Sequence, residues 1–268
     1  MGTRKKHEGV KVSIVTVVFN GSKTIKDCIE SVLGQQYPDI EYIVVDGASN
    51  DGTVEIVKNY GSKIAVFISE PDQGIYDAMN KGIKLATGDL IGILNADDFY
   101  KDNKVIGRVV SAIAENQSDG LYADLIYVNA QNLSQVKRYW RSGLVNKKSF
   151  LWGWMPPHPT FFLKRASYQK FGGFRLDLGS AADYELMLRM IHKNGLKMAY
   201  LPTITTVMRT GGVSNSSVFN RLKANRNDRD AWEVNGLKPY FFSLWLKPFR
   251  KISQFFNKAE RPLDKLRT

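Results

Sequence analysis

The chain has 268 residues, with 38 Lys or Arg against 26 Asp or Glu, so its formal charge is +12 at neutral pH. This length suits one large α/β domain or two small ones, and the 43 % hydrophobic content is typical of a globular protein. The one cysteine, Cys28, excludes a disulfide framework and a multi-cysteine zinc site, and it favours a reducing compartment. The basic residues 1–11 lack the apolar run of a secretory signal, and no apolar stretch is long enough to predict a membrane span.

The positive charge is concentrated toward the carboxyl terminus. Residues 205–268 hold 13 basic and 5 acidic side chains, a surplus of +8, whereas the rest of the chain is close to balanced. A surplus of this size predicts an anionic partner, which can be a nucleotide, a nucleic acid or an acidic lipid surface.

Strand and helix patterns alternate four times in the first hundred residues. Short apolar runs rich in β-branched residues predict buried strands at 12–19, 42–45, 64–69 and 90–94. Apolar residues at helical spacing predict helices that begin after a cap at Ser22, at 53–59 and at 75–86. The fold class is therefore α/β, with a doubly wound, mostly parallel sheet and right-handed crossovers.

The pattern changes after residue 122. Residues 120–165 are rich in aromatic residues, Asn, Ser and Pro, and we expect antiparallel strands and long loops there. A helix at 182–192 and a strand at 197–201 follow.

Polar residues come directly after the predicted strands. Asn20 follows the first strand, Asp46 the second, Asp72 the third, and Asp97 and Asp98 the fourth. Ligands of an open parallel sheet bind at the carboxyl ends of its strands, so these residues are candidates for one site. Asp46 with Gly47 could equally form only a turn. Adjacent carboxylates repel each other, and a divalent cation such as Mg²⁺ or Mn²⁺ would neutralise them.

The chain resembles the nucleotide-binding half of inverting family 2 glycosyltransferases of the GT-A fold, of the bacterial surface-polysaccharide type. The resemblance lies in VSIVTVVFNGSKTIKDCIESVLGQQYPDIEYIVVDGASNDGT and in EPDQGIYDAMNKGIKLATGDLIGILNADD. It is continuous over about residues 11–100 and extends to about residue 212 through HPTFFLKRASYQKFGGF and AADYELMLR. It implies a catalytic domain over 1–215, with a nucleotide-sugar half at 11–100 and an acceptor half at 101–215.

The resemblance implies transfer of a sugar from a nucleotide-diphosphate sugar, with UDP the expected nucleotide, to a hydroxyl of a glycan or lipid-linked glycan. The residues that it places around the donor are Val18, Asn20, Asp46, Asp72, Tyr76, Asn80, Lys81, Asn95 and Ala96. His158 and Arg209 are further candidates for the diphosphate or acceptor site. A packing histidine and a surface arginine are the alternatives for these two.

The same resemblance implies a metal site with Mn²⁺ or Mg²⁺. Asp97 matches the metal-binding aspartate of the family's Asp-x-Asp motif, whereas Asn95 replaces the first aspartate. An amide brings no charge, so Asp98 is the candidate that compensates for it. A divalent cation would act as a Lewis acid on the leaving diphosphate.

Asp183 is the candidate general base, because an attacking hydroxyl must lose a proton to a positioned carboxylate. The family usually has Glu-Asp here, and this chain has Ala182-Asp183. A carboxylate that only favours the amino end of a helix is the alternative. Glu185 is a second candidate base.

The carboxyl-terminal segment 216–268 is expected to be a basic, aromatic, helical extension. Its part LKPYFFSLWLKPFRKISQFF, residues 237–256, interleaves aromatic residues with Lys and Arg, which is typical of a segment at an anionic membrane surface. A helix packed on the catalytic domain is the alternative. The expected location is cytoplasmic, with the protein peripheral on the cytoplasmic face of the inner membrane.

Three other functions compete with sugar transfer. A sugar nucleotidyltransferase would need a Gly-rich phosphate loop after the first strand, where the chain has Phe19-Asn20-Gly21-Ser22. A nucleic-acid-binding protein is supported by net charge alone, without a motif, so no nucleic-acid partner is expected. A dinucleotide oxidoreductase is disfavoured because no Gly-x-Gly-x-x-Gly follows the first strand.

Overall fold

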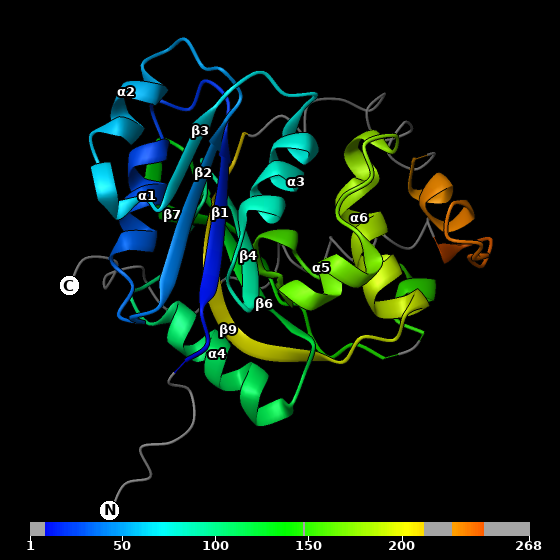
Figure 1. The fold of residues 1–268 in the computed structure, drawn as a ribbon. Helices are drawn as coiled ribbons and strands as arrows, with labels where there is room; N and C mark the ends of the chain where they lie inside the picture. Colours follow the sequence, from blue (N-terminus) through cyan, green and yellow to red (C-terminus); the bar gives the residue numbers. More distant parts are fainter. Residues whose placement is uncertain (1–8, 147, 212–226, 244–268) are drawn as a thin grey trace, which may run out of the picture.

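The computed structural model describes residues 9–146, 148–211 and 227–243. Its strands are β1 (Val12–Val18), β2 (Ile40–Asp46), β3 (Val66–Ser69), β4 (Leu90–Asn95), β5 (Phe99–Tyr100), β6 (Gly120–Asn129), β7 (Asn132–Trp140), β8 (Phe162–Lys164) and β9 (Met198–Arg209). Within the described residues they form one sheet with the order β3-β2-β1-β4-β8-β6-β9-β5, and β7 pairs with β6 outside this path (Figure 1).

The sheet is mixed, and its parallel part is the first hundred residues. β3, β2, β1 and β4 are parallel neighbours. β8 is antiparallel to both β4 and β6, whereas β9 is parallel to β6 and antiparallel to β5. The prediction of an α/β fold with a mostly parallel sheet, followed by a region with antiparallel strands, is confirmed.

The helices are α1 (Ile25–Leu33), α2 (Thr53–Lys58), α3 (Ile75–Leu85), α4 (Val105–Asn116), α5 (Arg165–Phe171) and α6 (Ala182–Met187). α6 continues into a π-helical turn over Leu188–Lys193, so the predicted helix at 182–192 is not α-helical throughout. Single turns of 3₁₀-helix lie at Gly61–Lys63, Phe150–Trp152, His158–Thr160 and Gly179–Ala181. Ser22 does not cap α1, because the helix begins at Ile25 and Thr24 occupies the cap position. The Ser22 amide donates to Asp51.

The helices cover the two faces of the sheet and create two apolar cores. On β1, Val12 and Ile14 face a core with α1 and α4, whereas Val15 and Val17 face a core with α3, α5 and α6. Successive side chains of a strand point to opposite faces, and all seven residues of β1 are buried, so this strand is covered on both faces. Ser13 and Thr16 are its polar residues, and the others are apolar. Figure 1 shows α1 and α2 on one side of the parallel strands and α3, α5 and α6 on the other.

Part of the expected carboxyl-terminal extension belongs to the second core. Residues 227–233 are helical, and Trp232 is fully buried among side chains of α6. The indole of Trp232 donates to the hydroxyl of Tyr184 at 2.9 Å. Of the aromatic segment 237–256, residues 244–256 lie outside the described part. In the part that is described, no helix has the length and apolar character needed to cross a membrane.

Candidate active site

The carboxyl ends of the parallel strands form one edge, and the strand register places polar residues side by side along it. Val18 of β1 pairs with Asp46 of β2, and Asp46 pairs with Ser69 of β3. On the other side of β1, Val17 pairs with Asn95 of β4. The chain segments that follow these four strands therefore meet at this edge, as the rule for parallel sheets predicts.

Asp46 is fully buried at this edge. Its Oδ2 accepts hydrogen bonds from the Ser49 amide at 2.9 Å and the Ser69 hydroxyl at 2.7 Å. Its Oδ1 is buried and has no hydrogen-bond partner among the described residues. An unpaired buried acceptor is costly, so Asp46 is suited to accept a hydrogen bond from a ligand.

Asn20 holds two loops of the edge together. It adopts a left-handed backbone conformation with φ = 51°, which Asn tolerates better than most residues. Its amide donates to Ser49 Oγ at 2.7 Å, and its Oδ1 accepts from the Asn50 amide at 3.0 Å. Val18, two residues before Asn20, is buried, and its carbonyl accepts from the Gly47 amide at 2.9 Å.

Asp72 packs directly against the loop after β2. Its Oδ1 accepts from the Gly74 amide at 2.8 Å, just before α3 begins. A Cβ at Gly47 would come within 2.6 Å of Asp72 Oδ2, so a larger residue at position 47 would displace the Asp72 carboxylate. Lys81 donates to the Pro71 carbonyl at 2.9 Å and pairs with Glu70 at 2.8 Å. Lys81 therefore anchors the loop that carries Asp72.

Tyr76 and Asn80 both contact Phe174, which follows α5 in the chain. Asn80 exchanges two hydrogen bonds with the backbone of Phe174, each of 2.8 Å, and Tyr76 packs on the Phe174 ring with a centroid distance of 5.3 Å. Burial and the negative charge of Asp183 raise the pKa of Tyr76. These contacts make Asn80 a structural residue, and its contact with a donor stays a prediction.

The acidic turn after β4 contains a buried carboxyl group without a partner. Asp98 is fully buried, and within the described chain neither of its carboxyl oxygens has a hydrogen-bond partner. Burial and the adjacent charge of Asp97 raise the pKa of Asp98 well above its usual range. Asp97 itself is half-buried, and the neighbouring Ala96 is buried with its amide donating to Val17.

Arg209, at the end of β9, binds the backbone of this turn. It donates to the Asp97 carbonyl at 2.6 Å and to the carboxylate of Asp27 on α1, and it lies over the Phe99 ring. Its side chain is only 8 % exposed. Because the guanidinium already binds these protein groups, its predicted role as a diphosphate clamp gains no support from the structure and stays a prediction.

The acidic turn fits a hard divalent cation that also binds ligand oxygens. Within the described ranges, no group of three or more His, Cys, Asp and Glu side chains could hold a metal ion. The turn does offer carboxylate oxygens from Asp97 and Asp98, and those of Asp98 are buried and unpaired. Mg²⁺ binds in this way, through one or two carboxylates completed by substrate phosphates and water.

Asp183 lies in the first turn of α6 and contacts His158. The distance from His158 Nδ1 to Asp183 Oδ2 is 3.3 Å, and the other ring nitrogen, Nε2, lies 3.4 Å from Asn95 Nδ2. His158 follows two prolines in the turn before β8, so three distant parts of the sequence meet here. The candidate base is therefore connected by side chains to the acidic turn after β4.

Glu185 is not a suitable base, and this second candidate is corrected. Its side chain is 1 % exposed and pairs with Arg189 through contacts of 2.8 and 3.0 Å. Asn235 also donates to it at 2.9 Å. A carboxylate with these partners has no access to an acceptor and instead joins α6 to residue 235.

Two contributors to the edge were missed in the sequence. Ser69 binds Asp46, and it occupies the last position of β3, where the strand-end rule would have found it. Phe19, whose side chain is 68 % exposed, follows β1 directly. An exposed aromatic side chain beside Asp46 is a surface on which a planar base can stack.

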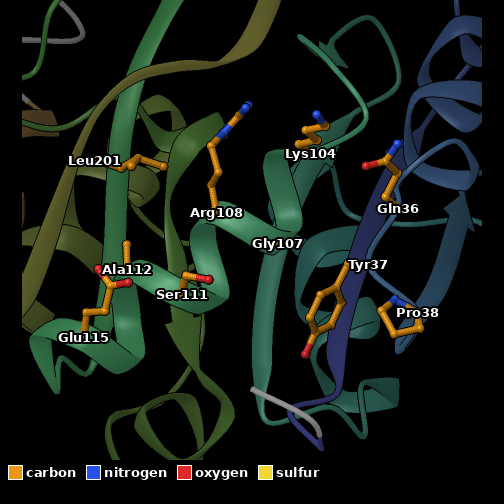
Figure 2. Close-up of a pocket in the computed structure, with 10 residues that line it drawn as sticks. All are labelled: Gln36, Tyr37, Pro38, Lys104, Gly107, Arg108, Ser111, Ala112, Glu115 and Leu201. Atoms are coloured by element: carbon orange, nitrogen blue, oxygen red, sulfur yellow. The ribbon is translucent and has the colours of Figure 1, made fainter. Parts of the chain in front are cut away.

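A groove of the surface lies away from this edge, beside α4, and has a volume of about 520 Å³. Figure 2 shows the residues that line it, which are Gln36, Tyr37, Pro38, Lys104, Gly107, Arg108, Ser111, Ala112, Glu115 and Leu201. No predicted site residue lines it. The volume of a groove therefore does not by itself identify the candidate site.

Comparison with known proteins decides the family. The sequence profile of glycosyl transferase family 2 matches residues 13–175, more than half of the chain. The chain belongs to glycosyl transferase family 2. It is a glycosyltransferase, and this decides against the nucleotidyltransferase and the nucleic-acid-binding protein as the main function.

Individual relatives agree with this assignment. A glycosyltransferase of Mycobacterium tuberculosis is 34 % identical over 180 residues, which cover 66 % of this chain and 68 % of the relative. Among solved structures, S. aureus TarS in complex with UDP superimposes with a TM-score of 0.66 at 20 % identity, over 91 % of this chain and 72 % of TarS. A mannosyltransferase from Pyrobaculum calidifontis in complex with GDP-Man and Mn²⁺ gives a TM-score of 0.63 at 18 % identity, over 96 % and 78 % of the two chains. The family 2 glycosyltransferase has the expected GT-A fold.

Proposed function

We propose that this glycosyltransferase moves a sugar from a nucleotide-diphosphate sugar, with UDP as the nucleotide, to a hydroxyl of a glycan or lipid-linked glycan, with inversion at the anomeric carbon. The observation that carries the proposal is the row of donor-side residues along one sheet edge with the carboxylate of Asp183 connected to it. The complexes of the structural neighbours with UDP and with GDP-Man and Mn²⁺ support the donor class.

In the proposed site, each group acts at a defined place. Asp46 accepts a hydrogen bond from the nucleoside through its unpaired Oδ1, and Phe19 stacks on the base. Asp97 and Asp98 would hold the divalent cation, which when bound supplies positive charge to the leaving diphosphate. Asp183 accepts the proton of the attacking hydroxyl, which approaches the anomeric carbon from the side opposite the diphosphate.

Replacing Asp183 by Asn tests the proposal. The change keeps the size of the side chain and removes the base, so we expect transfer to fall by about 10²–10⁴-fold while UDP-sugar binding stays the same. A radiolabelled transfer assay and isothermal calorimetry measure the two properties. Asp177→Asn, in an exposed carboxylate paired with Arg175, is the matched control. Transfer retained by Asp183→Asn would contradict the assignment.

We also propose that the protein works at the cytoplasmic face of the membrane, on an anionic lipid surface. Support comes from the carboxyl-terminal charge surplus and from Tyr240 and Phe241, which are 44 % and 87 % exposed next to Lys238. Exposed aromatic side chains beside cations suit the interface between headgroups and acyl chains.

A liposome experiment tests this location. The protein should co-sediment with vesicles that contain 30 % phosphatidylglycerol and dissociate as salt is raised, because the attraction to headgroups is screened. Removal of residues 237–268 should weaken binding, and Leu144→Ser, at another exposed apolar residue, is the control. Equal binding by the shortened chain would contradict the proposal.

A further inference from the structure

His158 connects the acidic turn to the candidate base. Asn95 is the last residue of β4, His158 lies in the turn before β8, and Asp183 is the second residue of α6. Nε2 of His158 lies 3.4 Å from Asn95 Nδ2, and its Nδ1 lies 3.3 Å from Asp183 Oδ2. The side chains of His158 and Asp183 are 34 % and 18 % exposed, so the contact between them is largely shielded from solvent.

The chemistry of the two outer groups fixes the imidazole between them. An amide nitrogen donates hydrogen bonds, whereas an ionised carboxylate only accepts them. With the amide nitrogen of Asn95 facing Nε2, the neutral imidazole that carries its proton on Nδ1 accepts at Nε2 and donates from Nδ1. An aspartate at position 95 could not donate to Nε2, so the asparagine that replaces the family's first aspartate suits this arrangement.

Both oxygens of Asp183 then have a donor from the protein. Oδ1 accepts from the Tyr184 amide at 2.7 Å, and Oδ2 lies 3.3 Å from His158 Nδ1, within reach of a proton carried there. Behind His158 and Asp183 the lining of a small cavity is mostly apolar, with Met79, Ile93, Phe161 and Phe174 among its residues. Hydrogen bonds beside an apolar wall are stronger than in water, so they hold the carboxylate in one orientation.

We propose that His158, kept by Asn95 in the Nδ1–H tautomer, is a positioning residue for Asp183. Its hydrogen bond aims one lone pair of the carboxylate at the acceptor hydroxyl and connects this aim to the turn that binds the donor. The inference rests on the proposed role of Asp183 as the base. His158 touches neither sugar in this role, which differs from the predicted contact with the diphosphate.

Kinetics of three variants at His158 test the positioning role. His158→Ala removes the donor, and we expect kcat to fall by about 10²-fold with little change in KM for the nucleotide sugar, because a misplaced base slows the reaction without weakening binding. Asn places its amide nitrogen near the position of Nδ1, whereas Gln places it near Nε2. His158→Asn should therefore recover much of the lost kcat and His158→Gln should not.

The tautomer gives a readout that does not depend on activity. Long-range ¹H–¹⁵N spectra of the full chain at pH 8 should show His158 protonated on Nδ1, with its signals assigned by their loss in His158→Asn. Asn95→Ala should give a mixture of tautomers, while the signals of the other two histidines of the sequence stay unchanged.

The outcomes separate this inference from the proposed function. Wild-type His158 protonated on Nε2, or full kcat in His158→Ala, would overturn the positioning role. If Asp183→Asn kept its activity while the tautomer was as expected, the role of Asp183 as base would fail and the positioning role would fall with it. A kcat loss in His158→Ala that Asn rescues and Gln does not, together with the Nδ1–H tautomer, supports the inference.

Discussion

The two ends of β2 each hold a buried carboxylate, and the surroundings of these two groups differ. Glu41, at the amino end, accepts hydrogen bonds from Lys11 at 2.7 Å, Ser13 at 2.5 Å, and both the amide and the hydroxyl of Thr87 at 2.8 and 2.5 Å. Asp46, at the carboxyl end, keeps Oδ1 without a partner among the described residues.

The same contrast extends to the neighbouring strands. Asn95 Oδ1 and both oxygens of Asp98 are also buried and unpaired in the described structure, and all lie at the carboxyl end. At the amino end the Glu41 carboxylate is satisfied, whereas at the carboxyl end Asp46, Asn95 and Asp98 keep acceptors without a partner among the described residues. A satisfied group contributes stability, whereas an unsatisfied one costs stability and is retained where binding needs it.

The largest expected effect is the loss of metal-dependent UDP binding at the carboxyl end of the sheet, with the stability of the fold unchanged. Asp97→Ala should remove the strengthening of UDP binding by Mn²⁺, which we expect to be about 10²-fold, because Asp97 is half-buried and carries a cation-binding carboxylate. Calorimetry with and without Mn²⁺, and after EDTA, measures this. The melting temperature should stay close to that of Asp39→Ala, an exposed control. Metal-independent UDP binding that is unchanged by Asp97→Ala would show that the metal role is wrong.

A pair of isosteric changes compares the two ends in stability. Glu41→Gln should lower the free energy of unfolding by about 1–3 kcal/mol, because it removes the charge that Lys11, Ser13 and Thr87 stabilise. Asp98→Asn should not lower it, because the buried carboxyl group loses no hydrogen bond. Urea unfolding without metal measures both values. The contrast between the ends fails if Asp98→Asn is destabilised as much as Glu41→Gln.

Two glycines allow a similar test with smaller effects. A Cβ at Gly88 would approach the Ser13 amide nitrogen at 2.7 Å and the Lys11 carbonyl oxygen at 2.8 Å, so Gly88→Ala should cost about 1–3 kcal/mol of stability. A Cβ at Gly47 would meet the Asp72 side chain, which can move. Gly47→Ala should therefore weaken UDP binding more than it changes the melting temperature. A larger loss of stability in Gly47→Ala than in Gly88→Ala would contradict the difference between the two ends.

The smallest expected effect is on the dependence of stability on pH under acidic conditions. Burial alone would raise the pKa of Glu41, but hydrogen bonds from Lys11, Ser13 and Thr87 outweigh it and lower this pKa to about 2. Because the folded-state pKa is below the unfolded value of about 4.3, Glu41 stabilises the fold above that pH. This contribution is lost as pH falls from about 4.3 to 2. Glu41→Gln should flatten the pH dependence there, by at most about 1.4 kcal/mol per pH unit. Equal slopes of unfolding free energy against pH in the wild type and in Glu41→Gln would contradict this role of Glu41.

The sequence predicts the parallel half of the fold well, because its signals are local. Each strand of that half is a short apolar run, and each helix has an apolar face, so periodicity finds them without knowledge of their partners. The order of β8, β6, β9 and β5 depends instead on pairings between distant segments, such as β4 with β8. No local pattern encodes these pairings.

For the candidate site too, local sequence patterns predict some residues, whereas others depend on contacts between distant segments. The strand-end rule places Asp46 and Asn95 on one edge, and the register confirms that they lie there. Sequence reasoning does not show that Arg209 pairs with Asp27, which is 182 positions away, or that Glu185 is enclosed by Arg189 and Asn235. Such contacts decide whether a charged side chain is free for a ligand, and only the folded chain brings them together.

The alkylation rate of Cys28 can measure local opening of the fold at the carboxyl ends of the parallel strands. This residue, the only cysteine of the sequence, is fully buried, and its Sγ lies 3.5 Å from the Asn95 carbonyl oxygen. Burial raises the pKa of the thiol to about 12, so alkylating reagents meet almost no thiolate in the closed protein. The rate at which iodoacetamide modifies the wild-type chain therefore reports how often α1 separates from the end of β4, and a bound nucleotide should slow that rate.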